Sequence, residues 1–397
     1  MSARLATAFA IIGRLSVVPF PSAPVLRVLA AILVGLPLCA AGEAPPPPPV
    51  AARAWLLVDF ASGQTIAGRN AEERLEPASL TKLMTAYLAF DALARKTITP
   101  GQTARVSERA RQAGGSRTFL TPAKPVTVEE LLQGMIVQSG NDATIALAET
   151  LAGSEDAFTR MMNREALRLG LKDTTFANAT GWSDPKQRST ARDLAVLAVA
   201  LIRDFPGDYP RYATREFRYN GVNQQNRNRL LWLDPNVDGV KTGYTEGAGY
   251  CLIASAKRGE RRLVSVLLGA NSDGARVQES QKLLNYGFQF FDSVRLYEKG
   301  QAVSSLRVWK GAAPVLKAGL ADDLHLVLPR GAAPKVTAEI VSEQPLVAPV
   351  SAGQKVGTVR VSLAGRPLGE YPVVALETVP VAGIFGRAWD SVRLWFE

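Results

Sequence analysis

The sequence contains very little histidine and cysteine, the residues that most often serve thiol and zinc chemistry. One histidine and two cysteines occur among 397 residues. His325 lies far in sequence from the motifs described below, so a Ser-His-Asp or Cys-His mechanism is excluded unless another domain brings this side chain to the site. A single histidine without a cysteine cluster gives no sign of a metal site, and we expect neither a metal nor an organic cofactor.

The scarcity of cysteine also excludes a fold built on disulfides. Cys39 lies in an apolar N-terminal segment. Cys251 lies in the apolar run of residues 249–254, where we expect a buried core side chain. If the N-terminal segment is removed, one thiol remains and no intramolecular disulfide can form.

The N-terminal segment lacks the length of a membrane span. Its apolar run, residues 28–38, is too short for a comfortable transmembrane helix and contains Pro37. Residues 1–41 are therefore expected to be an export signal, with a retained anchor as the alternative. Leu38, directly before the cysteine, argues against a lipoprotein signal. Residues 42–53 contain five consecutive prolines and are expected to form an extended, solvated linker.

The chain is basic, yet it lacks a dense Lys/Arg run and any nucleic-acid-binding motif, so we expect no nucleic-acid partner. The formal net charge is +10, and removing the three arginines of the expected export signal leaves about +7. A basic surface that only keeps the protein soluble and one that attracts an acidic polymer both remain open. The apolar content of 47% and charged content of 21% exclude a disordered chain.

Three short motifs stand in a fixed order along the chain. An S-x-x-K pattern alone arises by chance in most long chains, but the order and the spacings of about 60 and 100 residues make the combination a strong signal. The motifs are Ser79-Leu80-Thr81-Lys82, Ser139-Gly140-Asn141 and Lys241-Thr242-Gly243.

The motifs and their flanking residues, 76–82, 138–143 and 237–243, closely resemble the low-molecular-mass penicillin-binding proteins, the serine-type D-alanyl-D-alanine carboxypeptidases of peptidase family S11. The resemblance covers nearly all of the chain after the first fifty residues. It implies a penicillin-sensitive hydrolase that removes the terminal D-alanine from peptidoglycan pentapeptide stems through an acyl-enzyme on Ser79. It also implies binding of β-lactam antibiotics, a role in cell-wall synthesis and cell shape, and export to the periplasmic face of the bacterial inner membrane.

Three residues are expected to be catalytic: Ser79, Lys82 and Ser139. Ser79 and Lys82 are three residues apart, so on a helix they project from the same face. Lys82 is expected to be the base that activates Ser79, and burial or a second cation, Lys241, must then lower the pKa of this lysine. A Ser79 amide at a helix N-terminus favours a developing oxyanion, and Ser139 can relay a proton to the leaving group.

Six residues are expected to bind the substrate. Residues 241–243 are expected on an edge strand, where a peptide docks as an added strand and Thr242 and Lys241 meet its terminal carboxylate. The resemblance adds Arg227, in an Asn-Arg-Asn sequence, and Arg276 as guanidinium partners for that carboxylate, although a structural ion pair or a surface charge are the alternatives for these two. The full expected set is Asn141, which holds a substrate amide, Arg227, Lys241, Thr242, Gly243 and Arg276.

One residue departs from the family pattern. Tyr244 follows the K-T-G motif where several relatives carry histidine. We expect this difference to act on pH dependence or on handling of the leaving group, and not to remove the activity.

Residues 54–291 are expected to form an α+β catalytic domain. Strand patterns occur at both ends with helical periodicity between them, so the terminal segments are expected to share one antiparallel sheet. The resemblance implies the penicillin-binding and β-lactamase-like transpeptidase fold. Residues 292–378 predict a small all-β domain, which by resemblance is a β-sandwich stalk without a catalytic role.

Residues 379–397 are expected to form an amphipathic helix that anchors the protein peripherally on a membrane. Two tryptophans and two phenylalanines share one face, and the segment is too short and too charged to span a bilayer. The alternative is a helix that docks on the protein's own β domain.

Three other functions were weighed against the carboxypeptidase. A D,D-endopeptidase that cuts peptidoglycan cross-links is the closest rival, although such relatives generally lack the β stalk. A class A β-lactamase carries a Glu-x-x-Leu-Asn loop, which residues 216–220 mimic, but residue 216 lies 77 residues beyond Ser139, about twice the spacing in those enzymes. A non-enzymatic wall-binding protein is expected to have lost Ser79 or Lys82, and both are present.

Overall fold

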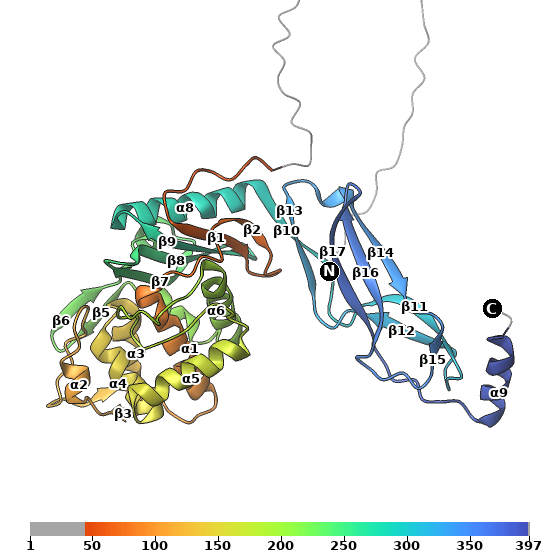
Figure 1. Cartoon of the computed structure of the whole chain (residues 1–397), viewed down its shortest axis with the longest axis horizontal. Helices are drawn as coiled ribbons and strands as arrows, with labels where there is room; N and C mark the ends of the chain where they lie inside the picture. The colour runs from red at the N-terminus through yellow and green to blue at the C-terminus, as the bar shows by residue number, and fades with distance from the viewer. Residues whose placement is uncertain (1–43, 396–397) are drawn as a thin grey trace, which may run out of the picture. The chain divides into compact units, whose positions relative to one another are not determined.

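The computed structural model of the protein describes residues 44–395 (Figure 1). The expected export signal, residues 1–41, lies outside the described residues. Residues 44–49 of the expected linker have no regular structure and are mostly exposed. They nevertheless lie on helix α8 (Asp273–Phe290), because the Tyr286 hydroxyl donates to the Pro45 carbonyl at 2.7 Å and the Lys282 ammonium donates to the Pro49 carbonyl at 3.0 Å.

A five-stranded antiparallel sheet forms the centre of the N-terminal domain. Its strand order is β2-β1-β9-β8-β7, so strands from the start and from the end of the domain lie side by side. The prediction that the terminal segments share one antiparallel sheet is therefore confirmed. The strands are β1 (Ala54–Asp59), β2 (Thr65–Arg69), β7 (Val237–Thr245), β8 (Gly249–Arg258) and β9 (Arg261–Ala270).

Both faces of this sheet are covered by helices. Along β9, Val264 and Val266 face one apolar core while Leu263 and Leu267 face another. Helix α8, together with the short α7, covers the second core, and α1 to α6 contribute to the first (Figure 1). Burial on both faces explains why β8 and β9 are continuous apolar runs instead of alternating ones.

The helical region lies between β2 and β7, and three of its main helices, α3, α5 and α6, begin at residues whose side chains satisfy free backbone N–H groups. Thr127 and Glu130 form a reciprocal capping box, and the side chains of Ser154 and Thr190 each accept from an N–H of the first turn. The larger elements are α1 (Lys82–Ala94), α3 (Val128–Val137), α4 (Asn141–Ala152), α5 (Glu155–Arg168) and α6 (Ala191–Asp204). The smaller ones are η1 (Ala78–Thr81), β3 (Thr103–Ala104), α2 (Glu108–Arg111), β4 (Val126–Thr127), η2 (Tyr209–Ala213), β5 (Glu216–Tyr219), β6 (Val222–Gln225) and α7 (Leu230–Leu233).

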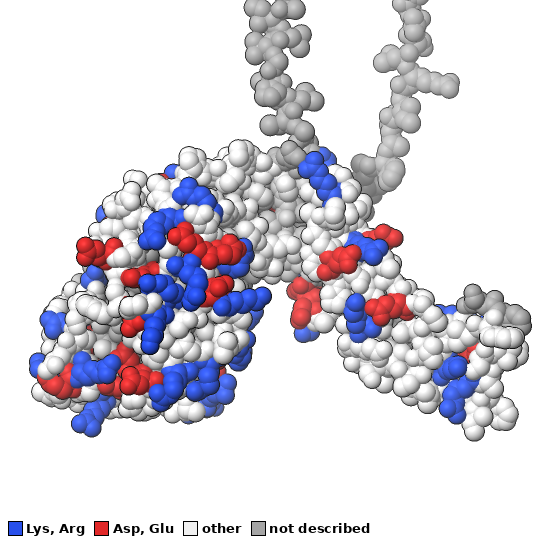
Figure 2. Space-filling view, in the orientation of Figure 1, with Lys and Arg blue, Asp and Glu red and all other residues white. Residues whose placement is uncertain are grey.

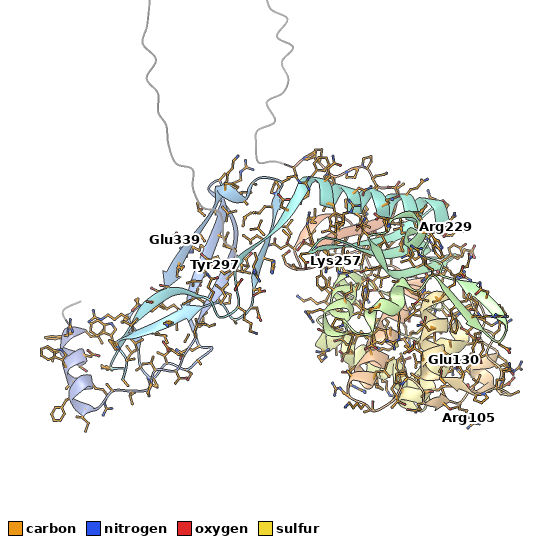
Figure 3. All side chains as sticks on the ribbon, turned by 180° about the vertical axis from the view of Figure 1, so that it is seen from behind. Arg105, Glu130, Arg229, Lys257, Tyr297 and Glu339 are labelled. Atoms are coloured by element: carbon orange, nitrogen blue, oxygen red, sulfur yellow. The ribbon has the colours of Figure 1, made fainter. Side chains whose placement is uncertain are left out.

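The C-terminal domain is all-β, as predicted. One pair of strands, β10 and β13, and a six-stranded sheet of order β14-β16-β17-β12-β11-β15 contribute to one apolar core that includes Leu316, Leu326 and Val359. The strands are β10 (Phe291–Tyr297), β11 (Ala302–Trp309), β12 (Val315–Gly319), β13 (Leu324–Pro329), β14 (Val336–Ser342), β15 (Leu346–Val347), β16 (Lys355–Leu363) and β17 (Arg366–Ala375), with the turn η3 (Ala333–Lys335). Tyr297 and Glu339 mark this domain in Figure 3.

The last described helix is α9 (Ile384–Arg393), which has no buried residue. Within residues 44–395, no helix is long and apolar enough to cross a membrane. Figure 2 shows acidic and basic side chains interspersed over the visible face of the N-terminal domain, so on this face the net positive charge does not collect in one patch.

Candidate active site

The structure brings Ser79 and Lys82 into direct contact. The Lys82 Nζ lies 2.9 Å from the Ser79 Oγ, 2.7 Å from the Asn141 Oδ1 and 2.6 Å from the Thr180 carbonyl oxygen. When this amine is neutral, its two N–H groups can satisfy the two carbonyl oxygens, and its lone pair then faces the serine hydroxyl. The geometry therefore suits proton transfer from Ser79 to Lys82.

The local backbone at Ser79 differs from the expected first turn of an α-helix. Residues 78–81 form the 3-10 turn η1, and α1 begins only at Lys82. Ala78 has a φ of +49°, which is rare for a residue with a Cβ. A Cβ on Gly181 would lie 1.8 Å from the Ala78 carbonyl oxygen, so the loop of residues 180–183 packs directly on this turn. Close packing on both sides explains how the unusual backbone at the nucleophile is held.

Burial makes Lys82 a base near neutral pH. Its side chain is 1% exposed. The pKa of Lys82 is lowered to about 7, mainly by desolvation and also by the positive charge of Arg227, while the negative charge of Asp142 opposes the shift. Burial, one of the two causes expected from the sequence, is the larger one, and Arg227 is a further cation that the sequence did not place near Lys82; Lys241 is coupled to Lys82 as well.

Lys241 is itself perturbed. Burial lowers its pKa well below the usual value, and Lys82, Arg227 and Arg276 add to the effect through their positive charges. Its Nζ lies 2.9 Å from the Ser139 Oγ and 2.9 Å from the Thr242 carbonyl oxygen. The two lysines therefore do not both retain a proton readily at neutral pH.

Ser139 and Asn141 connect α3 to α4. Ser139 has a φ of +63° and is 3% exposed, and its hydroxyl accepts from Lys241. The Asn141 side chain accepts from Lys82 and donates to the Gly114 carbonyl at 2.8 Å. Asn141 thus links the base to the loop that contains Gly114, while its expected contact with a substrate amide stays a prediction.

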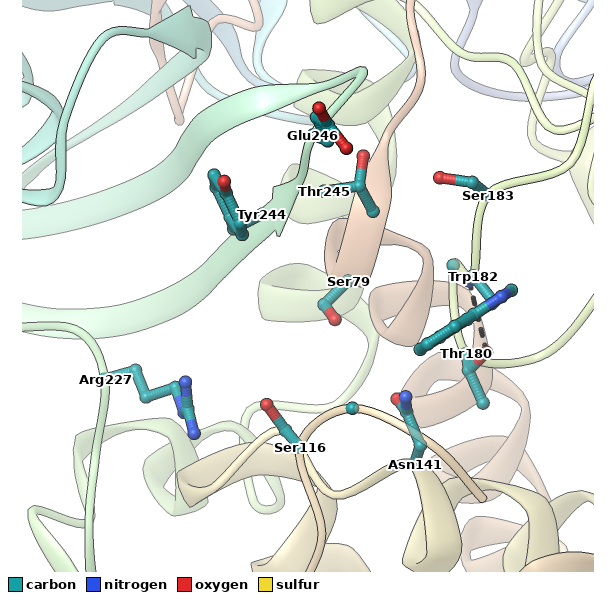
Figure 4. Close-up of a pocket in the computed structure, with 12 residues that line it drawn as sticks. Ser79, Ser116, Asn141, Thr180, Trp182, Ser183, Arg227, Tyr244, Thr245 and Glu246 are labelled. Atoms are coloured by element: carbon teal, nitrogen blue, oxygen red, sulfur yellow. Dashed lines mark hydrogen bonds between the residues drawn. The ribbon is translucent and has the colours of Figure 1, made fainter. Parts of the chain in front are cut away.

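A cleft of about 530 Å³ opens over Ser79 (Figure 4). Of the expected site residues, Ser79, Asn141 and Arg227 line it. In Figure 4, Arg227 lies on one side of Ser79 and Trp182 on the other. Sequence reasoning identified Tyr244 but missed the other lining residues, which are Gly115, Ser116, Thr180, Gly181, Trp182, Ser183, Thr245 and Glu246. Most of these lie in loops, where hydrophobic periodicity gives no signal.

The two expected arginines occupy different places. Arg227 faces the cleft, and partial burial lowers its pKa. Arg276 is 6% exposed and donates to the carbonyl of Gly243 at 3.1 Å. Its guanidinium also lies 5.5 Å from the ring centre of Tyr250, which is tilted against Tyr244 at 4.4 Å. Arg276 therefore supports the K-T-G strand from behind, and it is not among the residues that line the cleft.

The K-T-G motif lies on β7, the last strand of the sheet order, so the prediction of an edge strand is confirmed. Gly243 is needed there, because a Cβ would lie 3.1 Å from the Pro77 carbonyl oxygen and 3.2 Å from the Ala78 Cβ. Lys241 is 2% and Thr242 5% exposed. The docking of a peptide on this edge remains a prediction.

Two other residues weighed from the sequence lie outside the site. Glu216 is on β5, exposed, and accepts from Asn223 and Gln225 at 3.4 Å, so it does not line the cleft as a β-lactamase-type base would. His325 lies on β13 of the C-terminal domain. Within residues 44–395, no group of three or more His, Cys, Asp or Glu side chains is placed to hold a metal.

The chain is similar to characterised proteins over both domains. A family model described as D-alanyl-D-alanine carboxypeptidase, Peptidase S11, matches residues 41–272, and one described as penicillin-binding protein 5, C-terminal domain, matches residues 291–381. The D-alanyl-D-alanine carboxypeptidase DacC of Escherichia coli K12 is 44% identical over 88% of this chain and 89% of its own length. The crystal structure of penicillin binding protein 5 from Haemophilus influenzae matches with a TM-score of 0.83 and 37% identity, covering 85% of this chain and all of that one. A Bacillus subtilis carboxypeptidase, DacF, is 36% identical over 84% of this chain and 87% of its own.

Proposed function

The chain belongs to the peptidase S11 family of D-alanyl-D-alanine carboxypeptidases, and from this premise we propose that it removes the terminal D-alanine of peptidoglycan stem peptides through an acyl-enzyme on Ser79. The protein is a serine-type hydrolase. The observation that supports the Ser79 assignment most directly is the buried Lys82, whose Nζ lies 2.9 Å from the serine oxygen.

Acylation begins when neutral Lys82 takes the proton of the Ser79 hydroxyl. The serine oxygen attacks the carbonyl carbon between the two D-alanines, and the C–N bond breaks as the ester forms. The leaving amine needs one proton, and the proton that Lys82 took from Ser79 meets this need: Ser139, hydrogen-bonded to Lys241, can relay it, so that Lys82 is neutral again after acylation. A water molecule then hydrolyses the ester, which releases the shortened peptide and restores the Ser79 hydroxyl.

The cleft supports recognition of a free carboxylate at the end of the substrate. Arg227 faces the cleft beside Ser79, and Thr242 lies on the edge strand β7. A peptide that adds to this edge places its terminal carboxylate toward Arg227, where a guanidinium can bind both oxygens. Arg276 contributes by holding the Gly243 carbonyl.

β-Lactams enter the proposal as substrates of the same acylation step. Ser79 opens the lactam ring to give a covalent adduct, and structures of a related protein are titled as ampicillin-bound and cefotaxime-bound forms. Covalent labelling by a penicillin is therefore expected for this protein.

The rival D,D-endopeptidase and the carboxypeptidase are distinguished by their products. The model of the penicillin-binding protein 5 C-terminal domain matches the β domain, and this supports the carboxypeptidase. Mass spectrometry of products from a pentapeptide and from a cross-linked dimer is the test. Release of D-alanine from the pentapeptide with an intact dimer supports the proposal, whereas cleavage of the dimer alone overturns it.

We also propose that the protein is exported and held on the outer face of the inner membrane by α9. Phe385 is 92%, Trp389 66% and Trp395 87% exposed. The opposite side of the helix is fixed to the β domain, because the Lys310 backbone N–H donates to the Asp390 carboxylate at 2.6 Å. The polar face thus contacts the protein while the aromatic face stays available for the interfacial region of a bilayer.

A further inference from the structure

The cleft has two walls on the side of Ser79 away from Arg227. One wall is the loop that contains Trp182 and Ser183, and the other is the end of β7 with Thr245 (Figure 4). If Arg227 binds the terminal carboxylate, the residues upstream of the scissile bond run between these two walls. Their spacing then decides how well a long peptide fits.

Glu76 joins the two walls. Its Oε2 accepts from the Ser183 Oγ at 3.0 Å and from the Thr245 Oγ1 at 3.1 Å. The side chain is 21% exposed, and Arg188 lies 3.7 Å from its other carboxylate oxygen. One carboxylate, three residues before the nucleophile, therefore bonds to both sides of the cleft.

Further hydrogen bonds hold the loop that contains Trp182 and Ser183 against the residues around Ser79. Leu75 and Ser189 exchange backbone hydrogen bonds at 2.8 and 2.9 Å. The Gln187 Nε2 donates to the Thr81 Oγ1 at 2.7 Å. The loop of residues 181–189 is thus fixed to the residues around Ser79 at its far end, and Glu76 fixes it near its cleft end.

The second wall is held in a similar way. The Ala248 backbone N–H donates to the same Thr245 hydroxyl that donates to Glu76, at 3.0 Å. Gly247 packs against Glu76, because a Cβ on this glycine would lie 2.9 Å from the carboxylate. The turn after β7 therefore closes around the Glu76 side chain.

We propose that Glu76 is a positioning residue for this enzyme, which sets the distance between the Ser183 and Thr245 walls for the part of the peptide upstream of the scissile bond. This inference rests on the proposed function. The walls bind this part of the substrate before and during acylation, so their loss is expected to raise KM more than it lowers kcat. A misplacement of about 1 Å in a substrate-binding group can cost on the order of a hundredfold in rate.

The test uses three variants of the full chain. Glu76→Ala removes both hydrogen bonds, whereas Glu76→Gln keeps an oxygen that can accept both. Glu72→Ala is the matched control, because Glu72 pairs with Arg192 at 2.7 Å on the exposed surface. Each variant is assayed on a stem pentapeptide and on a short N-acylated D-Ala-D-Ala dipeptide, and thermal unfolding is measured in parallel.

We expect Glu76→Ala to lose roughly tenfold or more in kcat/KM on the pentapeptide, mainly through KM, and less than about threefold on the dipeptide. Glu76→Gln and Glu72→Ala should stay within about threefold of the wild type on both substrates. Equal losses on the two substrates, or a Gln variant as impaired as the Ala variant, would overturn the proposal.

Two further variants cover the case in which Glu76→Ala does not fold. Ser183→Ala and Thr245→Val each remove one of the two hydrogen bonds and should each produce part of the pentapeptide-specific loss. Wild-type values for both variants on the pentapeptide overturn the proposal. A wild-type protein that releases no D-alanine from either substrate contradicts the proposed function instead, so the two failures are distinguishable.

Discussion

At the scale of single residues, the chemistry depends on burying positive charge. Lys82 and Lys241 are almost completely buried, and Arg227 and Arg276 lie close enough to influence them. Each buried ammonium costs free energy, and the protein reduces this cost by releasing protons. Burial of these lysines therefore lowers the free energy of unfolding and, at the same time, favours a neutral amine that can act as a base.

The first prediction concerns the pH dependence that follows from Lys82. Its pKa of about 7 in the folded protein means that penicillin acylation should rise as pH increases through about 7, because the neutral amine is the base. Below about pH 7, Lys82 is protonated in the folded and the unfolded state, so its burial lowers the free energy of unfolding by the full amount. This loss of stability shrinks as the pH rises from about 7 toward 10.5, the pKa of the lysine in the unfolded chain, because the folded protein has then released the proton.

Lys82→Arg keeps the charge but cannot deprotonate, so it should lower the acylation rate at least about a hundredfold and abolish the pH dependence. Stopped-flow labelling with a fluorescent penicillin measures both effects, and a variant that acylates at the wild-type rate moves the base role away from Lys82.

The second prediction concerns Arg227. Arg227→Ala should raise KM for peptides with a free terminal carboxylate roughly tenfold or more, and affect amidated peptides far less, because the lost contact is a charge-assisted pair. It should also raise the pKa of Lys82, since a positive charge that lowers it is gone. Steady-state kinetics on the two peptide types and the acylation pH profile are the measurements. Equal losses on both peptides with an unshifted profile would indicate a structural role.

The motif residues of the site were predictable from the sequence, whereas most of the residues that line the cleft and the contacts between them were not. The three motifs indicated Ser79, Lys82, Ser139 and Lys241 because this chemistry tolerates few residue types at fixed spacings. The sequence could not show that Arg276 lies behind β7 and Arg227 in the cleft, because both are single arginines with no periodic signal. It also gave no sign of Trp182 or of Glu76 as contact residues, since loop conformation depends on tertiary packing.

At the scale of elements, the edge strand β7 packs against a series of side chains from α8 and β8. The Arg276 guanidinium donates to the Gly243 carbonyl and lies beside Tyr250, which in turn contacts Tyr244. Tyr244 lines the cleft. Arg276 on α8 is thus connected to Tyr244 at the cleft through the ring of Tyr250.

The third prediction follows from this arrangement. Arg276→Met fills much of the space but leaves the Gly243 carbonyl without its donor and removes the shorter of the two ion pairs of Asp273. We expect the free energy of unfolding to fall by about 1–3 kcal/mol and kcat/KM to fall with it. Urea unfolding and peptide kinetics test this, with Arg229→Met as a control because Arg229 makes only a long, exposed pair with Asp273 at 3.8 Å. Wild-type stability and activity in Arg276→Met would show that the strand does not need this support.

Some helices and strands could be predicted from the sequence and others could not. Amphipathic periodicity and capping residues mark helices α3, α5 and α6 in the sequence. The turn η1 was expected to be helical, and its 3-10 form with Ala78 at positive φ depends on contacts with Gly181 and Gly243 that are distant in sequence. In the β domain, the strand β15 is only two residues long, and two residues give no period that a sequence could reveal.

At the scale of the whole molecule, the candidate active site and the proposed membrane-attachment helix are separated along the chain. All residues that line the cleft lie between Ser79 and Glu246, whereas the exposed aromatic face lies on α9 near the C-terminus. The β domain between them has its own core. Helix α9 can therefore be removed without changing any residue that lines the cleft.

The fourth prediction concerns the loss of α9. Deleting residues 383–397 should release the exported enzyme from the membrane fraction while activity on small D-Ala-D-Ala peptides stays within about twofold. Each buried aromatic or aliphatic side chain contributes roughly 1.5–3 kcal/mol, so several on one face outweigh the ordering of a short helix. Cell fractionation and flotation with lipid vesicles are the measurements, and Phe385→Ser with Trp389→Ser should reproduce the effect in the full-length chain. A truncated protein that stays in the membrane pellet contradicts the anchor.

The central claim, that Ser79 forms the acyl-enzyme, is tested most directly by mass spectrometry of the intact protein. The wild type incubated with a penicillin should gain the mass of one drug molecule, and peptide mapping should place it on Ser79. Ser79→Ala should gain no mass and release no D-alanine from a pentapeptide, while Ser116→Ala, a second cleft serine, should still be labelled. Labelling of Ser79→Ala at the wild-type rate, or an adduct mapped to another residue, would contradict the account.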